Sequence, residues 1–139
     1  MKPLYVDASI VLSELLGEKT GSFRLSDASV LYSSDIIEVE VFRTLERARF
    51  SGRLEVGAFT HKISEATAYL SSLYRVSLSP GIIRLAKNAF PIPVRALDAI
   101  HVATAEWLIS ETDEKIEFHT HDLRQGEAAL SRGIAVHGV

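Results

Sequence analysis

Four acidic residues stand where an α/β protein could bring them together: Asp7, Glu40, Asp98 and Asp122. Asp7 follows a short apolar run, and aspartate is disfavoured inside strands, so Asp7 marks an expected strand end. Asp122 follows the strand expected at 116–119. Asp98 opens one apolar helix pattern, and Glu40 lies in the first turns of another. Open α/β sheets place their ligand crevice at the carboxyl ends of strands. The four carboxylates are therefore candidates for one shared site.

Four carboxylates at one sheet edge would repel each other unless a proton or a cation intervened. The chain has no cysteine, which leaves oxygen and imidazole as the available metal ligands. Oxygen ligands suit Mg²⁺ or Mn²⁺. Such sites usually act on phosphate esters, where the metal activates water and stabilises charge on the phosphoryl oxygens.

Two of these acids, and a histidine near one of them, also have simpler explanations. Asp122 begins an Asp-x-x-Gln pattern with Gln125, and a capping box explains that pattern without any catalytic role. Asp98 suits the first turn of a helix, but its helix is apolar on nearly every side, so its carboxylate needs a partner. His101, three residues after Asp98, is expected to hydrogen-bond near the site rather than to bind metal.

Glu40 must be separated from its neighbour Glu38. Asp35 and Glu38 form Asp-x-x-Glu at the start of a helix, so capping accounts for Glu38. Glu40 flanks the apolar face of that helix, and Arg43 and Arg47 share its flank. Either Glu40 forms a surface pair with an arginine, or it faces a crevice in which the arginines bind phosphate.

The hydrophobic pattern predicts about five short strands that alternate with helices. Strands are expected at 4–7, 30–33, 74–78, 116–119 and 134–136. Helices are expected at 9–16, 20–28, 35–50, 55–73, 80–89, 96–109 and 123–130. The alternation predicts an α/β fold of three layers, with a central parallel sheet between helices and the first strand buried at its centre.

Composition narrows the class of protein. The 139 residues suggest one domain, and 47% hydrophobic with 24% charged residues is typical of a soluble globular protein. No run reaches the roughly 18 apolar residues of a membrane span, and a cytoplasmic location is expected. The net charge of −3 argues against bulk electrostatic binding of nucleic acid. Contact with nucleic acid would have to use metal ions and a local basic patch.

Several segments, taken in order, resemble a known family. They are Tyr5–Ser9, Ile37–Arg43, Arg95–Ala105, Thr120–Asp122 and Arg132–Ile134. Together they resemble the PIN-domain ribonucleases, and among them the VapC-like toxins of toxin–antitoxin pairs. The resemblance covers essentially the whole chain, so it implies a single PIN domain over residues 1–139 with a PIN-like fold.

The resemblance implies a metal-dependent endoribonuclease that cuts single-stranded RNA with Mg²⁺ or Mn²⁺. The acids carried over are Asp7, Glu40, Asp98 and Asp122, with the hydroxyls of Ser9 and Thr120 lining the site. VapC-like toxins usually form homodimers and are inhibited by a cognate VapB-like antitoxin. Three arginines are candidates for holding RNA phosphates: Arg43, Arg47 and Arg95. His121 stands where the family commonly has an aromatic residue such as tyrosine.

The sequence argues against two other phosphate-binding folds, and one alternative from another class is kept. A dehalogenase-type phosphatase needs a second aspartate where this chain has Ser9, and a response-regulator receiver needs a late lysine that is absent near His137. A PIN-like module in RNA processing, or a catalytically silent binding partner, is the alternative from another class. The apolar stripe of the helix expected at 55–73 suits either the core or a dimer surface, with the core as the default.

Overall fold

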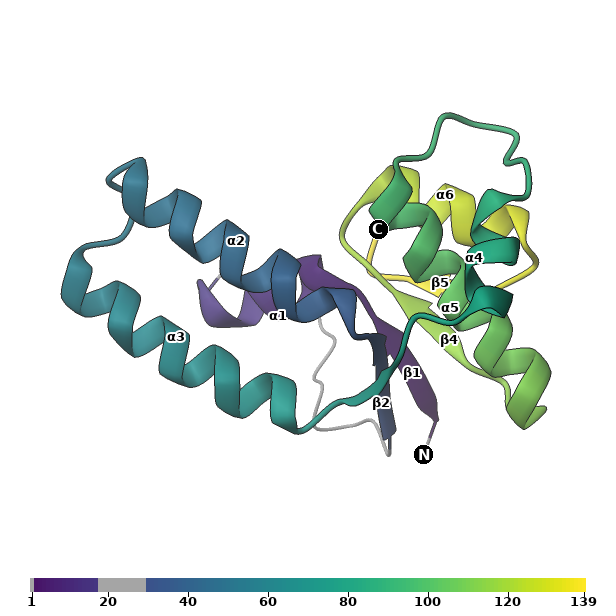
Figure 1. Cartoon of the computed structure of the whole chain (residues 1–139), viewed down its shortest axis with the longest axis horizontal. Helices are drawn as coiled ribbons and strands as arrows, with labels where there is room; N and C mark the ends of the chain where they lie inside the picture. The colour runs from purple at the N-terminus through teal and green to yellow at the C-terminus, as the bar shows by residue number, and fades with distance from the viewer. Residues whose placement is uncertain (1, 18–29) are drawn as a thin grey trace.

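The computed structural model describes residues 2–17 and 30–139 (Figure 1). The strands are β1 (Pro3–Val6), β2 (Val30–Ser34), β3 (Tyr74–Val76), β4 (Glu117–His119) and β5 (Val136–His137). The helices are α1 (Ala8–Leu15), α2 (Ile36–Phe50), α3 (Val56–Ser71), α4 (Pro80–Lys87), α5 (Ala96–Thr112) and α6 (Leu123–Ser131). The helix expected at 20–28 lies outside the described residues.

The five strands form one parallel sheet in the order β3-β2-β1-β4-β5. β1 lies at the centre of the sheet, as predicted for the first strand. Its residues Tyr5 and Val6 are fully buried. The chain moves outward from β1 through β2 to β3, and later continues on the other side of β1 with β4. The strand order therefore reverses between β1 and β4, which is where sheets of this kind open a crevice.

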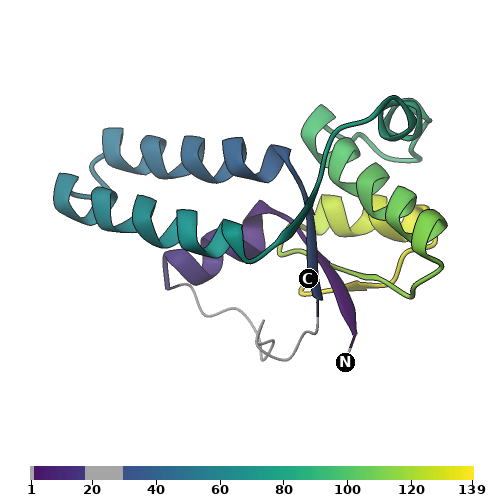
Figure 2. The same ribbon diagram turned by 60° about the horizontal axis from the view of Figure 1, so that its bottom comes forward.

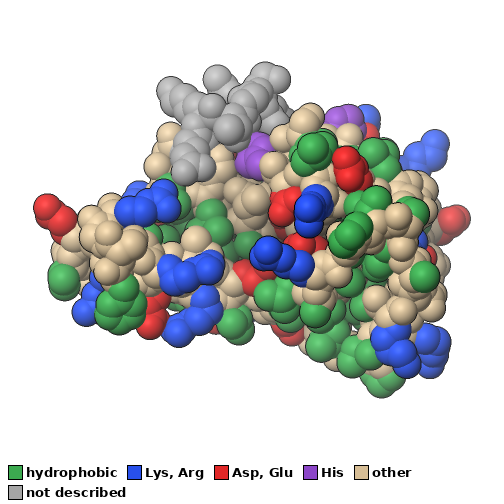
Figure 3. Space-filling view, turned by 90° about the horizontal axis from the view of Figure 1, so that it is seen from above, with side chains coloured by type: hydrophobic (Ala, Val, Ile, Leu, Met, Phe, Trp, Pro, Cys, Tyr) green, Lys and Arg blue, Asp and Glu red, His purple; other side chains and the backbone are tan. Residues whose placement is uncertain are grey.

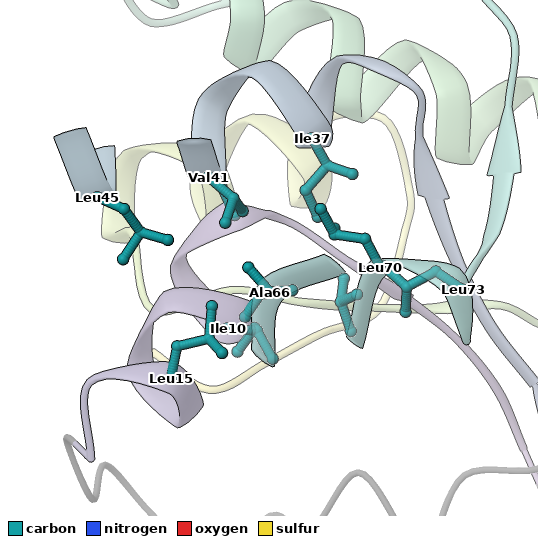
Figure 4. Packing of buried hydrophobic residues seen from close by; sticks show 11 residues of the cluster. Ile10, Leu15, Ile37, Val41, Leu45, Ala66, Leu70 and Leu73 are labelled. Atoms are coloured by element: carbon teal, nitrogen blue, oxygen red, sulfur yellow. The ribbon is translucent and has the colours of Figure 1, made fainter. Parts of the chain in front are cut away.

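Helices cover both faces of the sheet, which confirms the three-layer prediction (Figures 1 and 2). One cluster of buried side chains joins α1, α2 and α3, and a second joins α5 and α6 to β1 and β4. Figure 4 shows the first cluster, in which residues of α2 such as Val41 point toward Ile10 of α1 and Ala66 of α3. Each face of the sheet is thus covered by a separately packed layer.

The long helix α2 follows its sequence pattern closely. Its buried residues are Ile37, Val41, Leu45 and Ala48, which recur at helical spacing as predicted. α3 runs back along α2, and its stripe packs against α1 and α2, so the expected core role of α3 is confirmed. The α2–α3 pair extends beyond the sheet (Figure 2).

Some predicted boundaries were wrong. The last strand is Val136–His137 rather than 134–136, because Ile134 still bonds back to the end of α6, its N–H donating to Ala129 O at 3.1 Å. α5 continues past 109 to Thr112, where Asp113 ends it in a left-handed conformation with φ of 55°. Within residues 2–17 and 30–139, no helix combines the length and apolar composition needed to cross a bilayer.

The predicted capping box at the start of α2 is also wrong. The Asp35 side chain makes no capping hydrogen bond; the Ile36 N–H donates to Ser34 Oγ at 3.3 Å instead. Glu38 accepts from Arg75 of β3 at 2.8 Å. The chain enters α2 through Ser34 because the Asp35 backbone is already helical, a conformation in which its side chain does not reach the free N–H groups.

Candidate active site

Asp7 is buried at the carboxyl end of the central strand β1. It is also the N-cap of α1, since its Oδ1 accepts from the backbone N–H groups of Ser9 at 3.1 Å and Ile10 at 3.4 Å. Ser9 Oγ donates to Oδ1 and Thr120 Oγ1 donates to Oδ2, both at 2.5 Å. Asp7 is only 2% exposed, so these donors replace the water that its carboxylate would otherwise bind.

Ser9 and Thr120 also connect the ends of β1 and β4. Ser9 Oγ accepts from the His121 backbone N–H at 2.9 Å, and Thr120 Oγ1 accepts from that of Asp122 at 3.0 Å. The structure therefore brings both predicted hydroxyls next to Asp7. They bind the carboxylate and the following loop, which fixes where Asp122 begins α6.

Asp122 caps α6, with its Oδ1 accepting from the Gln125 N–H at 3.2 Å. The expected reciprocal bond from the Gln125 side chain is absent, because that side chain turns toward the other acids. With its nitrogen facing the carboxylates, the Gln125 amide lies 2.8 Å from Asp7 Oδ2 and 3.2 Å from Asp98 Oδ1. The opposite orientation would direct the amide oxygen at two carboxylates, so the nitrogen is assigned to this position.

Glu40 reaches the same region from α2, on the other side of the crevice. Its Oε1 lies 2.5 Å from Nε2 of His101, and Nδ1 of this ring lies 2.7 Å from the Tyr5 hydroxyl. His101 and Tyr5 are fully buried. The structure thus gives His101, expected to hydrogen-bond near the site, two partners, Glu40 and Tyr5.

The surface pair considered for Glu40 does not form. Arg43 pairs with Glu46, and Arg47 donates to the Thr44 hydroxyl at 3.2 Å. Glu40 instead joins the α2 layer to α5 through His101.

Two carboxyl groups of the site, those of Asp7 and Asp98, have pKa values above the ordinary value for aspartate. Burial raises the pKa of Asp7, although His101 and the hydrogen bonds from Ser9 and Thr120 oppose the shift. Burial also raises the pKa of Asp98. The negative charge of Asp122 raises it further, with smaller contributions from Glu40 and Asp7, and His101 opposes them. The acids are close enough to disfavour each other's charged forms.

A cavity of about 800 Å³ opens over the site between α2 and the start of α5. Three of the four acids line it, and Asp7 is buried behind them beside Ala8, which also lines it. The three predicted phosphate ligands line the same cavity: Arg43, Arg47 and Arg95. Figure 3 shows acidic side chains in the middle of this face with Lys and Arg side chains beside them.

Sequence reasoning missed two residues here. Arg124 lines a smaller adjoining cavity together with Arg95, Asp98 and Asp122. Gln125 was assigned only to capping. No sequence signal marked it, because its burial beside Gly126, Ala128 and Ala129 is known only from the structure.

Among the described residues, no three or more His, Asp or Glu side chains are arranged so that they could hold a metal ion directly. The chemistry of the donors nevertheless fits a hard divalent cation. All four acids offer carboxylate oxygens, and the mutual repulsion that raises the pKa of Asp98 is the kind that a cation removes. The Gln125 amide lies within hydrogen-bond distance of both Asp7 and Asp98.

Two comparisons with known proteins bear on this geometry. The profile of the PIN domain matches residues 4–128, which include all four acids and Gln125. Comparison with curated proteins gives no significant match.

Proposed function

The chain belongs to the PIN domain family, with its nuclease-type fold, and we propose that it is a Mg²⁺- or Mn²⁺-dependent endoribonuclease acting on single-stranded RNA. The observation that carries this proposal is that Glu40, Asp98 and Asp122 line one cavity although they come from three different parts of the chain. The buried Asp7 joins them through the Gln125 amide, which lies within hydrogen-bond distance of both Asp7 and Asp98. Helix caps explain single acids, but they do not explain a shared position beneath a cavity.

In the proposed mechanism, the carboxylates of Asp7, Glu40, Asp98 and Asp122 would hold the cation. The bound metal would lower the pKa of a water molecule and stabilise charge on the scissile phosphate. Ser9 and Thr120 keep the Asp7 carboxylate in place, and His101 keeps Glu40 directed at the site. Arginines that line the cavity would bind the phosphates of the RNA backbone.

Arg43, Arg47 and Arg95 are the proposed phosphate ligands. Arg43 and Arg47 lie along α2 and Arg95 precedes α5, so they border the cavity from both sides. Guanidinium groups pair well with phosphate oxygens. Apolar groups line the same cavity, including exposed Val39 and Phe50, and an RNA base could pack against them.

The test is RNA cleavage with Mg²⁺ or Mn²⁺ by the wild type, Asp7→Asn and Asp98→Asn. Both variants should lose at least about a hundredfold in rate. Glu111→Gln, an exposed acid near the far end of α5, is the matched control and should keep full activity. Equal cleavage by all four proteins would overturn the site assignment.

We further propose that the chain acts in the cytoplasm as a VapC-like toxin, with residues 1–139 forming one PIN domain. It would form a homodimer and be inhibited by a VapB-like antitoxin. The resemblance of the motif segments supports this role. Sedimentation at rising protein concentration should show a dimer, and a monomer at high micromolar concentration would contradict it. A PIN-like module that only binds a partner is the alternative, and absence of metal-dependent cleavage would favour it.

A further inference from the structure

One side chain in the site has no role in the mechanism above, although it contacts more of the acids than any arginine does. The Gln125 amide nitrogen lies 2.8 Å from Asp7 Oδ2 and 3.2 Å from Asp98 Oδ1. The Gln125 backbone N–H also donates to Asp122 Oδ1 at 3.2 Å. One residue of α6 therefore binds three of the four acids, and only 3% of its surface is exposed.

The chemistry of an amide suits this position only in part. Its NH₂ group carries two hydrogens, so it can donate one to each of two carboxylates. The amide has no charge, however, and cannot cancel the repulsion between Asp7 and Asp98. Gln125 thus donates to the buried Asp7 and to the half-buried Asp98, and it leaves the charge of both carboxylates uncompensated.

Both oxygens of the Asp7 carboxylate already accept as many hydrogen bonds as their lone pairs allow. Its Oδ1 accepts from the backbone of Ser9 and Ile10 and from the Ser9 hydroxyl, and its Oδ2 accepts from Thr120 and Gln125. A carboxylate oxygen offers about two lone-pair sites. A ligand to Asp7 must therefore displace a donor.

Gln125 is the donor that can leave. The donors from Ser9 and Ile10 belong to the start of α1, and the Thr120 hydroxyl is a short side chain that also accepts from the Asp122 N–H. Gln125 has the longest and most rotatable side chain of the four. Its departure would open a position between Asp7 and Asp98 without moving the backbone.

We propose that Gln125 is a positioning residue that holds Asp7 and Asp98 together in the cation-free chain and gives up its place between them to a divalent cation. The inference rests on the proposed function, because it assumes that these acids bind metal. It adds a competition: cation binding costs the two hydrogen bonds that the amide makes.

The experiment compares wild type, Gln125→Met, Gln125→Glu and the control Glu127→Gln, which removes an exposed charge from the same helix. Tm in chelator and the Kd for Mn²⁺ by calorimetry are measured for each. Met has a similar length and no donor, so Gln125→Met should have a lower Tm in chelator and bind Mn²⁺ roughly tenfold more tightly. Glu127→Gln should match the wild type in both.

Gln125→Glu covers the case in which the Met variant does not fold. Its carboxylate removes the donor and adds charge beside Asp7 and Asp98, so Mn²⁺ should bind more tightly and raise Tm by more than in the wild type. Unchanged or weaker Mn²⁺ binding in a folded variant would overturn the inference while leaving the proposed function standing. A wild type that binds no Mn²⁺ would overturn both.

Discussion

Glu40 is held at the site by a buried imidazole rather than by an arginine. The chain of hydrogen bonds runs from the Tyr5 hydroxyl through both nitrogens of His101 to the Glu40 carboxylate. Partners of this kind orient a ligand carboxylate, and their loss typically costs ten- to a hundredfold in metal affinity or activity. His101, although distant in sequence, therefore orients the Glu40 carboxylate, and Tyr5 holds the imidazole from its other nitrogen.

His101→Gln should lower the rate of RNA cleavage by about ten- to a hundredfold, because Glu40 loses the imidazole that directs it. Initial rates at saturating Mn²⁺ measure the effect, and denaturant unfolding shows whether the fold is retained. Tyr5→Phe is the matched control: it keeps the ring stacked on Phe118 and loses only the outer hydroxyl. It should lose less activity than His101→Gln. The reverse order would contradict the positioning role of His101.

The buried residue His119 predicts that the stability of the fold depends on pH. Burial and, to a smaller extent, the charge of nearby His137 lower the pKa of this histidine to about 4, against the opposing effect of Glu117. Between pH 6.5 and 4 the unfolded chain binds the proton more readily than the folded one, so stability falls as pH falls through this window. The loss should be roughly 1 to 3 kcal/mol.

Denaturant unfolding at pH 7 and pH 4.5 measures this loss. The His119→Phe variant can still stack on His137. In this variant the free energy of unfolding should differ less between pH 7 and pH 4.5 than in the wild type, because the contribution of His119 is removed. An equal pH dependence in the variant and the wild type would show that other groups cause it.

The sequence predicted the four acids because each follows a recognisable element start or end. It did not predict their partners. The bond between Glu40 and His101 joins residues 61 positions apart, and the contact of Gln125 with Asp7 depends on how α6 leaves β4. Periodicity identifies the side of a helix that is buried, but it does not identify which polar group lies opposite.

At the scale of elements, the described helices and four of the five strands were predictable, and the last strand was predictable only in part. α2 shows its buried face at regular spacing, so its extent could be read from the pattern. β5 has only two residues, and its position depends on pairing with β4, Phe118 lying beside Val136. Such pairing is a tertiary contact, which explains why the predicted strand at 134–136 was displaced.

The segment between α4 and α5, which carries Arg95 to the cavity, is fastened by Arg132 after the end of α6. The Arg132 guanidinium donates to Glu106 at 2.6 Å, to Asn88 O at 2.9 Å and to Leu85 O at 3.3 Å. It also lies 3.9 Å from the centre of the Phe90 ring. One planar group thus binds α5, the end of α4 and the following loop.

Arg132→Lys should lower the free energy of unfolding by about 2 kcal/mol, because an ammonium cannot make these contacts together. Chemical denaturation measures the loss. Arg84→Lys, an exposed arginine of α4, is the control and should change stability by less than about 0.5 kcal/mol. If both variants were equally stable, Arg132 would not be fastening the loop.

At the scale of the whole molecule, the charge of −3 limits how nucleic acid can bind. The arginines at the cavity are few, and Arg43 is already paired with Glu46. In chelator the acids at the centre of the site should repel phosphate. Affinity for RNA should therefore depend on the cation rather than on bulk charge.

Binding of a short single-stranded RNA in chelator should be weak, and fluorescence anisotropy at 50 and 200 mM salt tests this. A protein that neutralises many phosphates loses a large factor in affinity between such salt concentrations. Tight binding in chelator with a steep salt dependence would show that an extended basic surface, not the cation, binds the RNA.

The two separately packed clusters have a consequence for partial unfolding. Glu40 belongs to the α1–α2–α3 layer, whereas Asp98 and Asp122 belong to the layer of α5 and α6, and Asp7 lies between them. If one layer opened by itself, the other would keep its helices but lose part of the acid set. Hydrogen exchange could then report a chain that is half protected and inactive, so helical content alone would overstate the active fraction.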